Sequence, residues 1–316
     1  MWEGLRDSIV DVIRQKVEGK DVGIACSGGL DSGLISAISK EYARSVTLYT
    51  CGTNNAFDVS MAKDLSKRLN LPFVHVQISK GTIEDLIKEL ITATGVSDPF
   101  TISYELQLFS VCKECSQDIL LTGQGADEYF MGCAKYVGQT EEEFDLLRKA
   151  GIERLLNVSV PCEKAIADYF GKDLFYPYLD DRVQDEISKI DPASMMPEDM
   201  DSRKQVLKDV ATDLGYGFLA DRKKKSSQYG SGTTDLIRAI ARERGVGYAN
   251  LIAIFYDEVV YGEKQLERGA VVNARIDPIV KLKAEKILME RGLSPSEAIE
   301  NYYREVIRSE EENRSD

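Results

Sequence analysis

Apolar runs and amphipathic stretches alternate along the first part of the chain. Four short apolar runs have the length of strands, at residues 22–26, 46–51, 72–78 and 118–122. Helical periodicity marks the stretches between and after them, at residues 32–43, 58–69, 83–94 and 104–115. This alternation predicts an α/β fold, with a parallel sheet that carries helices on both faces. In such a sheet, ligands bind beyond the carboxyl ends of the strands.

The pattern changes twice further along the chain. Residues from 141 to about 241 are mostly helical in pattern, with an interruption rich in Pro, Asp and Ser at 191–201. Near Gly269 a short alternating segment, 270–277, precedes two further helical runs. Pro278 begins the first run, and Gly292 separates it from the second. We therefore expect two domains, residues 1–268 and residues 269–316.

Charge and composition disfavour several classes of protein. The formal net charge of −13 opposes general binding to nucleic acid, because phosphate contacts need clustered cations. No apolar run approaches the roughly 18 residues of a membrane span, and no signal peptide pattern opens the chain, so we expect a cytoplasmic protein without a membrane partner. A single histidine, His75, makes histidine triads and multi-histidine zinc sites poor hypotheses. The chemistry is expected to rest on carboxylates, lysines, backbone amides and a metal.

A glycine-rich turn follows the first predicted strand and opens a helix. It reads Ser27, Gly28, Gly29, Leu30, Asp31 and Ser32. Two glycines let the backbone approach an anion, and the free amides and dipole of the helix end favour phosphate. No Gly-Lys-Ser/Thr closes the turn, so it is not a Walker loop. Because Asp31 would repel phosphates without a divalent cation between them, the turn predicts pyrophosphate bound with Mg²⁺. The plainer alternative is a tight turn in which Asp31 and Ser32 cap the helix.

A second glycine-rich turn follows the predicted strand at 118–122. It reads Thr122, Gly123, Gln124, Gly125, Ala126, Asp127 and Glu128. If the two strands are neighbours, Asp31 and Asp127 converge above the edge of the sheet and could share magnesium. The alternative is an ordinary acidic loop.

Together the two turns resemble those of the asparagine synthetase family. Its ATP-pyrophosphatase (PP-loop) domain carries a Ser-Gly-Gly-x-Asp-Ser loop and a later Gly-Glu-Gly-x-Asp-Glu loop. The resemblance extends to Tyr178-Leu179-Asp180 and to residues 222–232, which are similar to the family's lysine segment. By that register Lys224 is the lysine that contacts the phosphates. The match covers roughly residues 1–265, and it implies a sheet of the adenine nucleotide α-hydrolase type.

The resemblance also implies a reaction. A carboxylate attacks the α-phosphorus of ATP, pyrophosphate leaves, and the acyl-adenylate is converted to an amide. The implied catalytic residues are Lys224, Gln124 and Asp127, with Mg²⁺ held by Asp31 and Asp127. The implied ATP-contacting residues come from both turns: Ser27, Gly28, Gly29, Asp31, Ser32, Thr122, Gly123 and Gly125. Lys224 would stabilise the charge that grows on the phosphorus oxygens, although Lys223 and Lys225 remain candidates for this role.

The sequence departs from the family pattern in two ways. Gln124 stands where the family usually has Glu, and an amide accepts a proton less well than a carboxylate. The chain begins Met1-Trp2, without the cysteine nucleophile of a glutaminase domain. We therefore expect a small-molecule carboxylate substrate, together with ammonia from solution or from a separate glutaminase, or an amine in its place.

The last segment resembles the ribbon-helix-helix fold of bacterial-type antitoxins. There, two chains pair their short strands, which completes a core that about 45 residues could not sustain alone. A homodimer through residues 269–316 follows from this resemblance. In DNA-binding relatives Asn273 and Arg275 would face the major groove. Residues 269–316, however, hold 8 basic and 10 acidic residues, a net charge of −2, which favours dimerisation over DNA binding.

Two other classes of function remain open. One is a tRNA-modifying PP-loop enzyme of the thiolation or lysidine type, because such enzymes share the first turn. The other is a DNA-binding regulator with a vestigial nucleotide domain. The second turn and Lys224 favour the amide-forming ligase, and the acidic net charge disfavours the tRNA-modifying enzyme.

Overall fold

The structure is a computed structural model that describes residues 2–222, 227–262, 272 and 274–313. Its strands form a five-stranded sheet in the order β3-β2-β1-β4-β5, and every neighbouring pair is parallel. The strands are β1 Asp21–Ala25, β2 Ser45–Gly52, β3 Phe73–Gln77, β4 Ile119–Thr122 and β5 Asp173–Phe175. The first four lie where the apolar runs predicted them.

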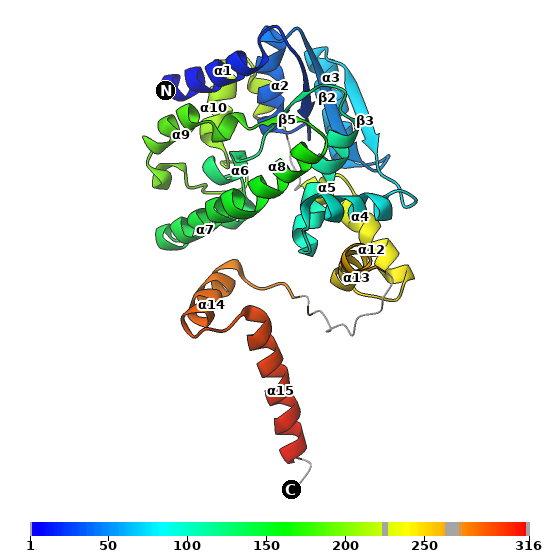
Figure 1. The fold of residues 1–316 in the computed structure, drawn as a ribbon. Coiled ribbons are helices and arrows are strands. Elements are labelled where there is room, and N and C mark those ends of the chain that lie inside the picture. Colours follow the sequence, from blue (N-terminus) through cyan, green and yellow to red (C-terminus); the bar gives the residue numbers. More distant parts are fainter. Residues whose placement is uncertain (1, 223–226, 263–271, 273, 314–316) are drawn as a thin grey trace. The chain divides into compact units, whose positions relative to one another are not determined.

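The helices of the described residues follow the strands along the chain (Figure 1). The α-helices of the first half are α1 Glu3–Val17, α2 Leu30–Tyr42, α3 Phe57–Leu69, α4 Ile83–Thr94, α5 Pro99–Glu114, α6 Ala126–Tyr129 and α7 Glu141–Arg154. Those of the second half are α8 Val160–Tyr169, α9 Asp181–Ser188, α10 Gln205–Asp213, α11 Ser227–Gly230, α12 Thr233–Glu243, α13 Tyr248–Tyr261, α14 Pro278–Glu290 and α15 Pro295–Asn313. Shorter helical turns are η1 Ala134–Tyr136, η2 Leu155–Ser159, η3 Pro177–Leu179, η4 Pro192–Met195 and η5 Gly217–Leu219.

Two apolar cores flank the sheet. Successive residues of a strand point to opposite faces, so Leu48 and Leu121 join one core and Tyr49 and Leu120 join the other. The first core is covered by α1, α2, α3, α9 and α10, and the second by α4, α5, α12 and α13 (Figure 1). The predicted α/β sheet with helices on both faces is confirmed.

Helix α5 begins five residues earlier than predicted, because a capping signal was overlooked. The Asp98 side chain accepts a hydrogen bond from the Thr101 amide at 2.8 Å, and Pro99 occupies the first helical turn. Strand β5 was not predicted at all. It has three residues and pairs only with β4 at the edge of the sheet, too short for a period-two pattern.

The chain divides into two compact units, Met1–Val271 and Val272–Asp316. In the second unit Asp277 caps α14, and Ser294 and Glu297 form a reciprocal cap at the start of α15. The expected strand at 270–277 includes three residues outside the described part, 270, 271 and 273. The described residues 272 and 274–277 form no strand.

The single histidine contacts a neighbouring strand of the sheet. His75 Nε2 lies 3.0 Å from the Gly52 carbonyl oxygen, a contact between the adjacent strands β3 and β2. None of the helices within the described ranges is long and apolar enough to cross a membrane.

Candidate functional site

The two glycine-rich turns meet at the carboxyl ends of neighbouring strands. Strands β1 and β4 are hydrogen-bonded, and their last residues, Ala25 and Thr122, are paired in register. The chain leaves β1 toward β2 on one side, whereas β4 borders β5 on the other. This reversal is the switch point at which open α/β sheets bind ligands. The predicted side-by-side placement of the turns is therefore present.

The first turn holds its shape through close backbone contacts. Gly28 has φ +74°, and a Cβ there would lie 2.4 Å from the Ala62 nitrogen, so only glycine fits. Asp31 and Ser32 lie in the first turn of α2 and are buried, at 6% and 4% exposure. The buried Tyr178 hydroxyl donates to the Asp31 carbonyl oxygen at 2.9 Å. The Tyr178-Leu179-Asp180 segment, identified from its sequence, thus supports the first turn directly.

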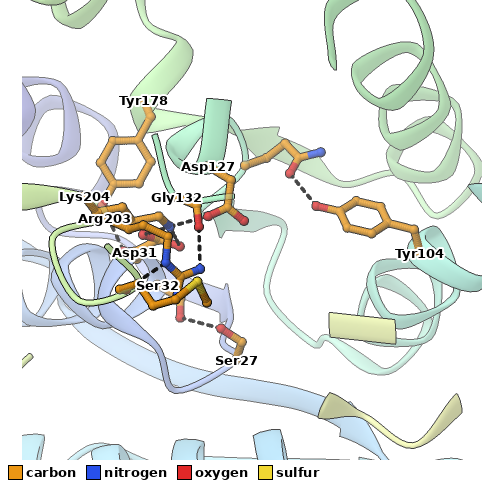
Figure 2. A network of polar contacts seen from close by, with 11 residues as sticks. Ser27, Asp31, Ser32, Tyr104, Asp127, Gly132, Tyr178, Arg203 and Lys204 are labelled. Atoms are coloured by element: carbon orange, nitrogen blue, oxygen red, sulfur yellow. Dashed lines mark hydrogen bonds and ion pairs between the residues drawn. The ribbon is translucent and has the colours of Figure 1, made fainter. Parts of the chain in front are cut away.

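A buried lysine, Lys204, joins the acids of the two turns. Its Nζ lies 2.5 Å and 2.6 Å from the two carboxylate oxygens of Asp31, and 2.6 Å from Asp127 Oδ1 (Figure 2). Lys204 is 7% exposed and has the left-handed φ of +60° just before α10. Such a backbone is costly for a side-chain-bearing residue and is often found at ligand sites. Asp31 and Asp127 therefore converge, as predicted, and they do so on an ammonium group.

Sequence reasoning missed Lys204. It follows an irregular Asp-rich loop and has no neighbouring glycines or motif letters to mark it. Space for its side chain comes from Gly132, since a Cβ there would lie 2.0 Å from Lys204 Cε. Arg203 fixes Gly132 by donating a hydrogen bond to the Gly132 carbonyl oxygen at 2.9 Å (Figure 2). Only the folded chain brings these segments together.

The two carboxylates are suited to a hard divalent cation. Asp31 and Asp127 reach a common point from two different turns, and carboxylate oxygens next to bound phosphates are the ligands that Mg²⁺ prefers. Among the described residues there is no group of three or more His, Cys, Asp or Glu side chains that could hold a metal alone. Two carboxylates leave most positions around an octahedral Mg²⁺ to other oxygens, such as those of water or phosphate.

The second turn presents Gln124 toward helix α5. The Tyr104 hydroxyl donates to Gln124 Oε1 at 3.0 Å (Figure 2). With its oxygen engaged in this way, Gln124 offers its NH₂ group as a donor and no group that can take up a proton. A glutamate at the same place, by contrast, could take up a proton.

The pocket beneath the turns has a volume of about 120 Å³ and contains two further acids, Glu105 of α5 and Glu163 of α8. They are 1% and 3% exposed. Burial and the charge of Glu163 raise the pKa of Glu105 well above its ordinary value. Burial raises the pKa of Glu163 to about 8, and the nearby Tyr176 hydroxyl offsets part of that rise. Neither acid was singled out from the sequence.

Glu163→Gln is expected to stabilise the fold at alkaline pH. The folded pKa is about 8 against 4.5 for a solvated glutamate, so between these values the unfolded chain releases the proton that the folded chain retains. Stability is therefore lost as the pH rises through this window, and glutamine removes that loss. Chemical denaturation should show a gain of about 2 kcal/mol or more at pH 8, and a much smaller one at pH 5. An equal loss at both pH values would contradict this account.

Lys224 lies outside the described residues, as do Lys223 and Lys225. The preceding residue, Arg222, is described, and its Nε donates to the Gly28 carbonyl oxygen at 2.5 Å while Nη1 contacts Asp64 at 2.8 Å. The basic segment thus starts at the first turn.

Comparison with known proteins supports one family. The asparagine synthase family model matches residues 4–160. A putative glutamine-hydrolyzing asparagine synthetase from Methanocaldococcus jannaschii is 29% identical over 77% of this chain and 52% of its own length. Asparagine synthetase B from Escherichia coli is 22% identical over 77% of this chain and 50% of its own length. The chain spans about half the length of these relatives.

Among solved structures, the NMN synthetase from Francisella tularensis covers 86% of this chain and 99% of its own, with a TM-score of 0.34 and 14% identity. Similarity at that level adds nothing to the assignment. The family match, the relatives and the paired glycine-rich turns together show that residues 4–160 of this chain are similar to the asparagine synthase family.

Proposed function

We propose that this chain uses ATP to adenylate a carboxylate and then transfers the acyl group to ammonia or an amine. The observation that carries the proposal is the meeting of Asp31, Asp127 and Lys204 at the ends of β1 and β4. A phosphate site needs cations and amides, and a magnesium site needs carboxylates. This point of the sheet combines all three.

Each part of the site has a role in the proposed reaction. The amides of the first turn and the start of α2 bind the phosphates, as helix N-termini bind anions. Lys204 and Lys224 stabilise the charge that develops on the phosphorus oxygens, since fixed cations act strongly where water is excluded. Gln124 and Tyr104 orient the acyl group or the nucleophile from the second turn and α5.

Asp31 and Asp127 would hold Mg²⁺, which supplies a positive charge that neutralises pyrophosphate as it leaves. Without nucleotide, the Lys204 ammonium satisfies the same two carboxylates. The site thus keeps its acids close together with no divalent cation bound, at the cost of a strained backbone at Lys204.

A screen for pyrophosphate release tests this function. ATP, Mg²⁺ and a panel of amino and other carboxylic acids should give AMP and pyrophosphate with the cognate acid, and ammonium should increase the amount of amide formed. ADP and phosphate as products would contradict adenylation. Because the curated relatives are glutamine-hydrolyzing, a separate glutaminase is the proposed source of ammonia.

We further propose that residues 269–316 dimerise the protein. Of the second-unit residues whose side chains are described, only Ile279 is buried. Large apolar side chains on α14 and α15 are exposed: Val280, Ile287, Met289, Ile299, Tyr302, Tyr303, Val306 and Ile307. A unit of this size with so little core needs a second copy to bury its apolar faces.

Deleting residues 269–316 is expected to give a monomer that still releases pyrophosphate. The reason is that both turns, Lys204 and Lys224 all precede residue 269. Light scattering on the full chain and on the truncated chain measures the change in mass. A full-length monomer would contradict the dimer, and specific binding of the full chain to duplex DNA at physiological salt would point to the alternative role.

A further inference from the structure

The pocket contains an acid pair, Glu105 and Glu163, that the phosphate chemistry does not use. The two side chains line the same pocket as Ser27, Asp31 and Asp127 of the glycine-rich turns. They come from helices α5 and α8, which pack against each other. The pair therefore faces the space where the acyl group would be activated.

Each member of the acid pair has a covered oxygen with no partner. Glu105 Oε1 and Glu163 Oε2 are shielded from solvent and accept no hydrogen bond from the residues that the structure describes. No ion pair reaches either carboxylate from that part of the chain, although the charge of Arg154 acts on Glu105 from a distance. An unpaired buried acid is costly, and two facing the same pocket are more so. Such a cost is typical of a ligand site.

The chemistry of the pair selects its ligand. Two carboxyl groups with unpaired acceptor oxygens fit a cation that donates several hydrogen bonds, and an ammonium group does so. A divalent metal fits less well, because among the described residues no group of three or more His, Cys, Asp or Glu side chains could hold a metal ion. Gln124 is uncharged, and its oxygen already accepts a hydrogen bond from Tyr104, so it does not compete with the acid pair for an ammonium group.

We propose that Glu105 and Glu163 bind the nitrogen substrate as its cation, ammonium or a primary ammonium, and that Glu163 removes the proton that makes the nitrogen a nucleophile. This inference rests on the proposed function and names its second substrate. It also supplies the base that Gln124 cannot be.

With ammonium as the substrate, the reaction begins with a proton transfer. Ionised Glu163 takes one proton from NH₄⁺, which leaves NH₃ and a neutral carboxyl group. The nitrogen lone pair forms the C–N bond to the acyl carbon, the bond from that carbon to the AMP oxygen breaks, and AMP leaves with its electron pair. After the C–N bond forms, the nitrogen loses one more proton to give the neutral amide. This proton goes to solvent, and AMP is released. The carboxyl group of Glu163 then releases the first proton.

The surroundings of Glu163 suit this role. The pKa of Glu163, about 8, is close to the pKa of a protonated amine, roughly 8 to 10. An ordinary carboxylate has a much lower pKa. Proton transfer from the amine to Glu163 is therefore nearly balanced in free energy. The groups that act on the pair are Glu128, Arg154, Tyr104, Tyr176, Cys112 and Cys162. Of these only Arg154 is cationic. A bound ammonium would thus become the principal positive charge beside the pair.

Glu163→Gln separates this role from the rest of the reaction. Hydroxylamine is uncharged at neutral pH and needs neither a cation site nor a base. The ratio of ammonium-dependent to hydroxylamine-dependent turnover should therefore fall about 100-fold in the variant. Asp168→Asn, an exposed acid on the same helix, is the matched control and should keep the wild-type ratio. Glu105→Gln should lower the ratio in the same direction.

A binding measurement makes the test independent of turnover. Ammonium chloride, compared with sodium chloride at equal ionic strength, should raise the Tm of the wild-type protein by roughly 2 °C. Glu163→Gln should abolish that difference, and Asp168→Asn should keep it. An unchanged ratio, or an ammonium effect that survives in Glu163→Gln, would overturn the proposal.

Two further outcomes separate the hypotheses. If Glu163→Gln loses acid-dependent ATP–pyrophosphate exchange as severely as amide formation, the pair serves the acyl substrate, and the proposal is wrong. If the wild-type protein shows no exchange with any acid, the proposed function fails. The ammonium effect on Tm then still decides whether the pair binds a cation.

Discussion

Replacing Lys204 with methionine is expected to destabilise the protein by about 3 kcal/mol and to reduce pyrophosphate release by about 100-fold or more. Methionine keeps most of the side-chain volume but leaves the carboxylates of Asp31 and Asp127 facing one another without the ammonium between them. Chemical denaturation and a pyrophosphate assay measure the two effects. Lys208→Met, at a partly exposed position in α10, is the matched control.

Magnesium should partly rescue this variant. If Asp31 and Asp127 form a cation site, Mg²⁺ takes the place of the lost ammonium and raises the Tm of Lys204→Met more than that of the wild-type protein. An equal response of both proteins to Mg²⁺ would argue against a magnesium site shared by the two acids. A variant as stable and as active as the wild-type protein would remove Lys204 from the account altogether.

Replacing Lys224 with alanine is expected to slow adenylation by about 100-fold and to change ATP affinity only slightly. The charge that Lys224 would stabilise grows mainly in the transition state, whereas the proposed contacts of the turn amides to the phosphates are made in the ground state as well. Acid-dependent ATP–pyrophosphate exchange and equilibrium ATP binding separate the two quantities.

Lys223→Ala and Lys225→Ala are the controls for that variant, since all three lysines belong to one basic segment. An adenylation rate that is unchanged in Lys224→Ala and reduced in one control would reassign the role. Equal losses of affinity and rate would indicate that the lysine binds the ground state and the transition state alike.

The sequence predicted those parts of the molecule whose signals are local. Both glycine-rich turns follow strands directly, so the fold could be inferred from strand–turn–helix order. The meeting of Asp31 with Asp127 followed only on the condition that β1 and β4 are neighbours, which they are. Helix α4 was predicted with its observed bounds because apolar residues recur on one face and Gly95 ends it. Strand β5 has too few residues for any periodic signal.

The parts that were missed depend on tertiary contacts. Lys204 is separated from Asp31 by 173 positions, and nothing near it in the sequence distinguishes it from a surface lysine. Glu105 and Glu163 had a usable signal that was overlooked. Glu163 shares a helical face with the buried Ile166 and Ala167, so an acid stands where the pattern calls for an apolar residue.

Such a position deserves the same weight in sequence analysis as a motif. An acid within an apolar helical stripe costs stability unless it is paired or bound. Glu105 fits this description as well, because Ile102 and Phe109 lie on its side of α5. The two acids of the proposed amine site could therefore have been nominated before any coordinates were known, although not their proximity.

The transfer of oxygen from the acid to AMP tests the central claim most directly. With the cognate carboxylate labelled with ¹⁸O, adenylation forms the acyl–oxygen–phosphorus bridge, and amide formation then breaks its carbon–oxygen bond. Mass spectrometry should find one ¹⁸O atom in the phosphate group of AMP for each amide formed. Label in inorganic phosphate, or AMP without label, would contradict attack of the carboxylate on the α-phosphorus of ATP.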